Sequence, residues 1–168
     1  QEAVAPVLPT APKVLRVNLD TYPGIIDPQK SSFVAEIAHL QLIYEGLTRL
    51  DANLETVAGA AASWQYNADA TQLVFTLRPD LRYSDGSVLN AERFAYAIER
   101  NIDPETEGEY AQVTDEIQGA AEWRSCDTVG DPAACAAAKA VVDASVRASH
   151  ADGAPCAGYD DTACNTLT

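Results

Sequence analysis

The chain has 168 residues, enough for one domain, or one and a fragment of another, and it has no apolar run of the roughly 18 residues that a membrane span needs. Its formal net charge of -14 disfavours nucleic acid and anionic lipid as partners, because both would repel it. Residues 1–12 are rich in Ala and Pro and do not resemble a secretory signal, so we expect a disordered tether there.

The first elements of the chain read as a strand and a helix. In residues 13–19 the side chains alternate between two sets, which predicts a strand. Ser31 or Ser32 can cap a following helix, and Gly46 is suited to end it, because glycine adopts the left-handed conformation at low cost. This helix carries one apolar stripe, made of Ile37, Leu40, Tyr44 and Leu47.

The middle of the chain has the pattern of a small sheet. A short strand is expected at residues 47–50, and two β-rich runs, residues 64–66 and 72–77, bracket a polar loop and predict a hairpin. Residues 58–62 are small and unpatterned, so a turn of helix or a tight loop is expected. Together these elements predict an α+β fold, with an antiparallel or mixed sheet and flanking helices. The side chains expected to be buried are Ile37, Leu40, Trp64, Phe75, Leu77, Phe94 and Ile98.

Helices are expected to follow the hairpin. Asn90 is a good cap for a helix that Asp103-Pro104 ends. The acidic loop of residues 103–109 comes next, and it lacks the alternating spacing of a calcium-binding loop. A short helix is expected over about residues 113–121, with Trp123 beyond it.

The last part of the chain combines a helix with a cysteine-containing tail. Asp131-Pro132 starts an alanine-rich helix that runs to about His150, and the chain from Gly153 onward reads as a loop. Four cysteines allow three pairings, and their spacing is wider than that of typical zinc sites, which favours disulfides and an oxidising compartment. We expect neighbours to pair and residues 126–168 to be an appendage outside the main core. The cysteines are Cys126, Cys135, Cys156 and Cys164.

Catalytic and metal-binding motifs are missing from the sequence. His39 and His150 have no Ser, Cys or carboxylate at a known motif spacing, and His150 reads as a helix-end residue. Neither a phosphate-binding glycine loop nor an HExxH pair occurs. We therefore expect no enzyme activity, no cofactor and no metal. The aromatic residues of the hairpin are typical of a core, whereas Tyr110 follows a polar loop and is available to a ligand.

An ordered set of short motifs resembles the extracellular solute-binding proteins of family 5, which serve ABC importers of peptides, dipeptides and nickel. In that family a helix ends in YEGL, a strand leads to a WSDG turn, and the next helix reads DFxYSxxR. The corresponding segments here are residues 44–47, residues 83–86, with Tyr in place of Trp, and residues 93–100. The resemblance covers about residues 13–123, and the segment from Cys126 onward has no counterpart in the pattern.

The resemblance implies part of the first lobe of a two-lobed fold like that of periplasmic binding proteins. Family members are longer, so this chain looks like an N-terminal portion. Residues 13–125 would belong to lobe I, and residues 126–168 would be a cysteine-rich insertion in the same domain. In such proteins the loop after the Asp27-Pro28 segment reaches the ligand cleft. The implied ligand-binding residues are Gln29, Lys30, Ser31, Ser32, Phe33 and Tyr110.

The function implied by the resemblance is that of an extracytoplasmic solute-binding subunit. It would be a monomer that captures a peptide or similar solute between two lobes and delivers it to an ABC permease. The tether of residues 1–12 would follow a lipid anchor. Two other interpretations stay open: a self-contained secreted protein-interaction domain that reuses this architecture, and a secreted hydrolase, which the missing nucleophile and base disfavour.

Overall fold

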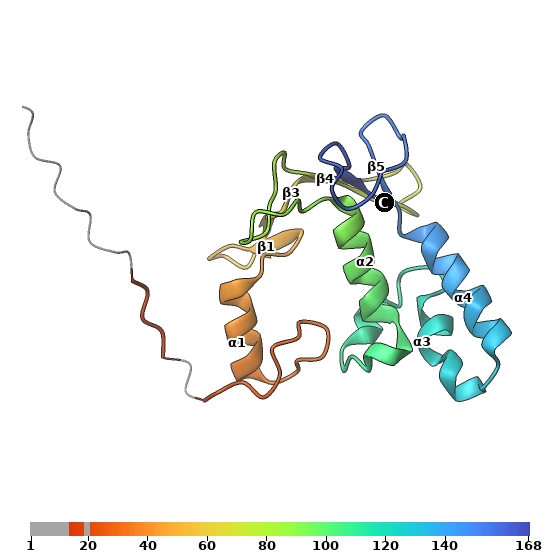
Figure 1. Cartoon of the computed structure of the whole chain (residues 1–168), viewed down its shortest axis with the longest axis horizontal. Coiled ribbons are helices and arrows are strands. Elements are labelled where there is room, and N and C mark those ends of the chain that lie inside the picture. Colours follow the sequence, from red (N-terminus) through yellow and green to blue (C-terminus); the bar gives the residue numbers. More distant parts are fainter. Residues whose placement is uncertain (1–13, 19–20) are drawn as a thin grey trace, which may run out of the picture.

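The strands gather at one end of the molecule, and helices α2, α3 and α4 extend away from them (Figure 1). The computed structural model describes residues 14–18 and 21–168. The helical elements are α1 (Val34–Ile43), α2 (Ala91–Ile102), η1 (Pro104–Thr106), η2 (Ala111–Thr114), α3 (Ala120–Val129) and α4 (Pro132–Ser145). The strands are β1 (Thr48–Leu50), β2 (Thr56–Ala58), β3 (Ala61–Tyr66), β4 (Leu73–Leu77), β5 (Ala148–Ser149) and β6 (Thr166–Leu167). The predicted α+β class is confirmed.

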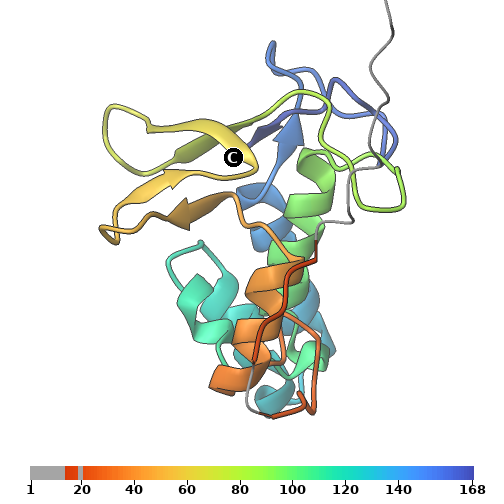
Figure 2. The ribbon, with the colours of Figure 1, turned by 90° about the vertical axis from the view of Figure 1, so that its left-hand side faces the viewer.

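The larger sheet has the strand order β3-β4-β6-β5, and its pairings are antiparallel. Strands β3 and β4 form the predicted hairpin, in which Trp64 lies opposite Phe75. Strands β1 and β2 form a separate antiparallel pair, which lies beside the hairpin in Figure 2. The turn or loop expected at residues 58–62 instead contains the end of β2 and the start of β3. The small side chains of Ala60 and Ala61 allow this close packing, and both are buried.

The C-terminal tail, expected to be a loop, contributes β6 to the sheet. This strand pairs with β4 on one side and with β5 on the other. Its Leu167 is 2% exposed and belongs to the core. Two residues are too few to show the alternation by which a strand is recognised, so the sequence did not reveal it.

The core lies between the larger sheet and helices α2, α3 and α4. Its fully buried side chains include Ile102, Val142 and Leu167, and the half-cystines Cys126 and Cys164 are also buried there. The prediction that residues 126–168 lie outside the main core is therefore wrong. Helix α4 needs only a narrow apolar stripe because its alanines let it lie close to α3.

Two of the side chains predicted to be buried, Leu40 and Leu77, are buried. The others are partly exposed, namely Ile37, Trp64, Phe75, Phe94 and Ile98. Of these, Phe75, Phe94 and Ile98 pack directly against the core. These three side chains therefore lie at the border of the core and keep an exposed edge, whereas Ile37 and Trp64 are partly exposed and are not part of this core cluster.

The predicted ends of α1 differ from those in the structure. The helix begins after Phe33 without a side-chain cap, and the Ser31 hydroxyl instead donates to a backbone carbonyl of the preceding loop. The helix ends before Tyr44, which is extended with φ -112° and ψ 146°. Gly46 therefore lies outside the helix and does not terminate it.

The later helices follow the sequence more closely. Asn90 accepts a hydrogen bond from the backbone N–H of Arg93, and Asp131 accepts one from that of Ala133, so both predicted caps are confirmed. The helix expected over residues 113–121 is instead divided between η2 and α3, which contains Trp123. Helix α4 ends five residues before His150.

The first predicted strand is absent from residues 14–18, the part of it that the structure describes. Residues 14–18 take part in none of the strand pairings of the structure. A strand requires a hydrogen-bonded neighbour, and alternation alone does not supply one. Residues 13 and 19, and the expected tether of residues 1–12, lie outside the described residues.

Candidate ligand-facing surface

The loop of residues 29–33 is folded locally by Asp27. Its backbone carbonyl accepts hydrogen bonds from the N–H groups of Lys30 and Ser31, and its carboxylate accepts one from the N–H of Gln29. An aspartate that bonds to the backbone two residues later is a common way to fix a turn. The loop is therefore a defined structure that leads directly into α1.

Arg100 joins this loop to α2. Its guanidinium donates to both carboxylate oxygens of Asp27, at 2.9 Å and 2.6 Å, and also to the side-chain oxygen of Gln29. The Gln29 amide in turn donates to the backbone oxygen of Ala97, at 3.1 Å. The bond from Arg100 lowers the pKa of Asp27 below its ordinary value, so both partners are charged at neutral pH. Bidentate pairing of this kind fixes orientation as well as distance.

Tyr110 lies against the same loop. Its hydroxyl is 3.5 Å from the backbone oxygen of Ser32, to which it donates. The approach depends on Gly108, because a Cβ at that position would lie 2.5 Å from the backbone oxygen of Gln29. The structure thus brings together the two segments that the resemblance implied, although they are far apart in the sequence. Their role in ligand binding stays a prediction.

The six implied ligand residues differ in what their side chains can reach. Phe33 and Tyr110 are 70% and 49% exposed, so both aromatic side chains are open to solvent. Ser31 is buried and Gln29 is bonded to α2, so both hold the loop in place. Lys30 lines a cavity together with Arg100. Asp27, Arg100 and Gly108 position the surface, yet the sequence analysis did not single them out as site residues.

Glu36 fixes the segment that precedes the loop. It is buried, and one of its carboxylate oxygens accepts hydrogen bonds from the backbone N–H groups of Gly24 and Ile25, at 3.1 Å and 2.9 Å. A buried carboxylate is costly unless it is bonded in this way. Helix α1 therefore holds the incoming chain from one side, while α2 holds the loop from the other.

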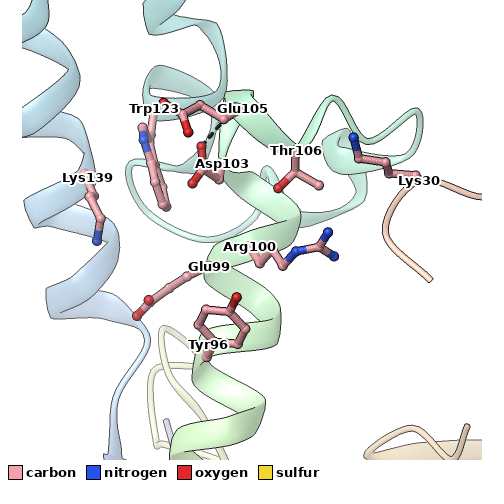
Figure 3. A pocket seen from close by; sticks show the side chains of 9 residues that line it. All are labelled: Lys30, Tyr96, Glu99, Arg100, Asp103, Glu105, Thr106, Trp123 and Lys139. Atoms are coloured by element: carbon pink, nitrogen blue, oxygen red, sulfur yellow. Dashed lines mark hydrogen bonds between the residues drawn. The ribbon is translucent and has the colours of Figure 1, made fainter. Parts of the chain in front are cut away.

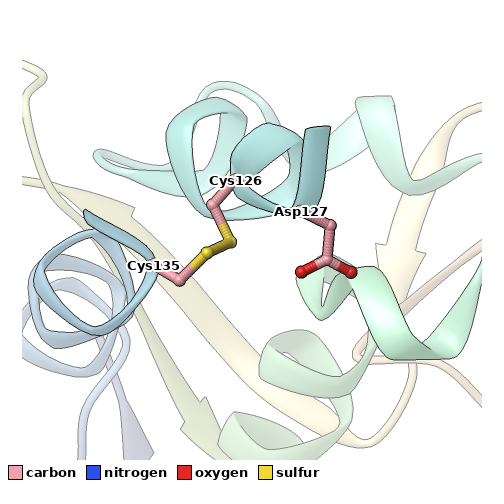
Figure 4. Close-up of side chains that lie close together, drawn as sticks. All are labelled: Cys126, Asp127 and Cys135. Carbon is pink, nitrogen blue, oxygen red and sulfur yellow. A yellow bond between two sulfur atoms is a disulfide. The ribbon is translucent and has the colours of Figure 1, made fainter. Parts of the chain in front are cut away.

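The four cysteines form two disulfides between sequence neighbours. Cys126 of α3 is bonded to Cys135 of α4 (Figure 4), and Cys156 is bonded to Cys164. Asp127 lies near the first disulfide, in a group of metal-ligand types. Metal binding by cysteine requires the thiolate, and these sulfurs are already bonded to each other. This group does not have the donors of a metal site.

His150 is paired with a carboxylate, contrary to its interpretation as a helix-end residue. Its Nε2 is 2.7 Å from an Oδ2 of Asp161, which also accepts the backbone N–H of Ala157, at 2.8 Å. These bonds, with that from His150 the largest, lower the pKa of Asp161 to about 2. The nearby Cys156 is in a disulfide and offers no nucleophile. The pair closes the loop of residues 150–161 and gives no sign of a catalytic role.

Comparison with known proteins identifies the family. A model of the bacterial extracellular solute-binding proteins, family 5, middle region, matches residues 55–150, which is more than half of the chain. The chain belongs to this family. The match continues well beyond Cys126, so the view that the family pattern ends before this residue is wrong. Among the described helices, none has the length and hydropathy of a membrane span.

Two of the relatives are named as periplasmic binding proteins. The probable deoxycholate-binding periplasmic protein of Escherichia coli (strain K12) is 35% identical over 107 residues, covering 61% of this chain and 19% of that protein. The periplasmic oligopeptide-binding protein of the same organism is 37% identical over 86 residues, covering 51% and 16%. This chain therefore spans only about a fifth of the length of these relatives.

Solved structures show the same relationship. The murein tripeptide binding protein of Escherichia coli aligns with a TM-score of 0.62 and 26% identity, over 86% of this chain and 24% of that chain. The oligopeptide-binding protein of Haemophilus influenzae aligns with a TM-score of 0.56 and 23% identity, over 89% and 25%. The first lobe of a periplasmic-binding-protein-like fold is thus the architecture to which this chain corresponds.

Proposed function

We propose that this chain is part of the first lobe of an extracytoplasmic solute-binding subunit, which delivers a peptide to an ABC permease. The family is extracellular and solute-binding, and the relatives named above bind an oligopeptide and a murein tripeptide. In this proposal residues 13–125 belong to lobe I, residues 126–168 belong to the same domain, with only the part beyond residue 150 lying outside the family match, and residues 1–12 are a tether behind a lipid anchor. The subunit acts as a monomer.

The observation that carries the proposal is the anchored loop beside Tyr110. Arg100 and Asp27 hold the loop, Phe33 of this loop is exposed to solvent, and the hydroxyl of the exposed Tyr110 bonds to the adjacent Ser32. Rigid aromatic side chains bind ligands at a low cost in conformational entropy. Phe33, Tyr110 and Ser32 are the residues that we expect to contact the peptide, with Lys30 at the edge.

We expect this chain by itself to bind peptide only weakly. In a two-lobed receptor the contacts are divided between the lobes, so a single lobe leaves the ligand open to water. Polar groups then gain little from a ligand that can bond to water instead, while the ordering of the ligand still costs free energy. The net charge of -14 favours basic over acidic peptides.

The test is a titration of the isotope-labelled chain with short basic peptides, followed by amide chemical shifts. We expect a dissociation constant weaker than about 0.1 mM, with shifts concentrated in residues 29–33 and 108–110. Tyr110→Ala should remove these shifts. Tyr66→Ala, which changes an exposed tyrosine of β3, is the matched control and should leave them unchanged.

Two results would contradict this proposal. A dissociation constant in the low micromolar range would mean that the chain carries a complete site, which favours the self-contained interaction domain. Shifts elsewhere in the chain, with none in the loop, would show that the loop does not face the ligand.

A further inference from the structure

A cavity of about 390 Å³ lies beside the C-terminal part of α2, where Arg100 and Glu99 line it (Figure 3). Tyr96 and Glu99 line it from α2, at a three-residue step that places side chains on one helix face, and Asp103, which follows the end of α2, lines it as well. Thr106 of η1 and Trp123 of α3 contribute from neighbouring elements. The cavity is thus built from several parts of the fold.

Most of the positive charge around the cavity is already neutralised by residues outside it. Arg100 is paired with Asp27, and Lys139 is paired with Asp143 at 2.6 Å. Neither of these aspartates lines the cavity. Only Lys30 remains to balance the lining carboxylates, which are Glu99, Asp103 and Glu105. The cavity therefore carries more negative than positive charge.

The unbalanced negative charge is clearest at Glu99. It has no basic group within ion-pair distance among the described residues. Burial raises its pKa, and the negative charge of Asp143 raises it further, against a smaller opposing effect of Lys139. A cation placed beside Glu99 would relieve the cost of holding this carboxylate ionised.

Two nearly buried side chains offer further contacts. Thr106 is 7% exposed, its hydroxyl has no hydrogen-bond partner among the described residues, and it points into the cavity in Figure 3. Trp123 is 6% exposed, and Nζ of Lys139 already lies 5.0 Å from its ring centroid, which shows that the indole face can accept a cation. A hydroxyl without a partner at the wall of the cavity can accept a hydrogen bond from a ligand that carries N–H donors.

We propose that this cavity binds an organic cation, namely an alkylammonium or guanidinium group. Carboxylates, a free hydroxyl and aromatic rings all match a cation that carries N–H donors and an apolar stem. An anionic ligand would meet the three carboxylates directly. The group can belong to a free diamine or to the Lys or Arg side chain of a peptide. The cavity shares Lys30 with the loop of the proposed function, but neither Phe33 nor Tyr110 lines it, so the two proposals can be tested separately.

The test is calorimetry at low ionic strength with cadaverine and agmatine, and with the peptides Ala-Arg-Ala and Ala-Ala-Ala. We expect both amines to bind and Glu99→Gln and Glu105→Gln each to weaken binding about fivefold. Thr106→Val should weaken it as well. Glu116→Gln removes the same charge from an exposed position outside the cavity and should have no comparable effect. In a Trp64→Phe variant, Trp123 alone should report binding by its fluorescence.

The peptide results separate the two sources of the cation. Binding of the amines alone would assign the cavity to free amines, whereas additional binding of Ala-Arg-Ala, sensitive to Glu99→Gln, would assign it to basic side chains as well. The inference is overturned if neither amine binds, or if Glu116→Gln weakens binding as much as Glu99→Gln. It is also overturned if binding is lost in Tyr110→Ala but kept in both cavity variants, a result that would leave the proposed function intact.

Discussion

The Arg100 guanidinium holds both carboxylate oxygens of Asp27, at 2.9 Å and 2.6 Å, across 73 residues of sequence. The pair fixes the start of the loop before α1 to the C-terminal half of α2. Two side chains far apart in the sequence therefore fix the loop to which the Tyr110 hydroxyl bonds.

Removal of this pair should loosen the loop more than it destabilises the fold. Both side chains are about 30% exposed, so solvent screens them, and we expect Arg100→Ala to cost about 1 kcal/mol. Arg100→Lys should recover only part of this, because lysine cannot form the bidentate pair. Urea denaturation gives the stability, and hydrogen exchange of residues 29–33 gives the loop opening. Unchanged exchange in Arg100→Ala would show that the pair does not hold the loop.

Gly108→Ala should separate Tyr110 from the loop. The new Cβ would lie 2.5 Å from the backbone oxygen of Gln29, and a backbone atom cannot rotate away. We expect a destabilisation of about 1–2 kcal/mol, measured by urea denaturation, and shifted amide signals in residues 29–33. Gln112→Ala, at an exposed position of the adjacent η2, should change neither quantity. Equal effects of the two substitutions would argue against close packing at Gly108.

The disulfides should each stabilise the chain appreciably. Free-thiol titration of the unreduced protein should find no reactive cysteine. In the chain-entropy account, loops this short are worth about 2.5 kcal/mol each. Replacement of Cys126 and Cys135 by Ser should therefore lower the free energy of unfolding by at least that amount, because Cys126 also lies in the core. Four titratable thiols, or a pairing other than between neighbours, would contradict the structure.

Asp161 should make the free energy of unfolding depend on pH in the acidic range. Its pKa is lowered in the fold from an ordinary 3.8 to about 2, chiefly by His150. The ionised carboxylate therefore stabilises the folded chain above about pH 4, and this contribution is lost as the pH falls towards 2. In Asp161→Asn, thermal melts should show lower stability at neutral pH and a weaker decline over this range. Asp160→Asn, which changes an exposed neighbour, serves as the control. If the loss of stability at low pH is weakened as much in Asp160→Asn as in Asp161→Asn, Asp161 is not its cause.

The sequence by itself determined the elements whose signals are local. Asn90 and Asp131 cap their helices through bonds to N–H groups two or three residues later, and Asp85 forms its turn through a bond to Ser87. The β3–β4 hairpin and the pairing of neighbouring cysteines likewise join partners that lie close in the chain. The ordered motifs identified the family, and the loop and Tyr110 followed from that resemblance.

Only the tertiary structure decided the contacts between distant segments. It brought the C-terminal tail into the sheet as β6, placed Cys126 and Cys164 in the core, and left Gly46 outside the end of α1. It also joined Arg100 to Asp27. Such contacts depend on how whole elements pack, and a two-residue strand or a single ion pair has too few residues to leave a periodic pattern. Local hydrogen bonds join residues that are close in the sequence and can be predicted from it. Burial and long-range pairing form only when the chain folds.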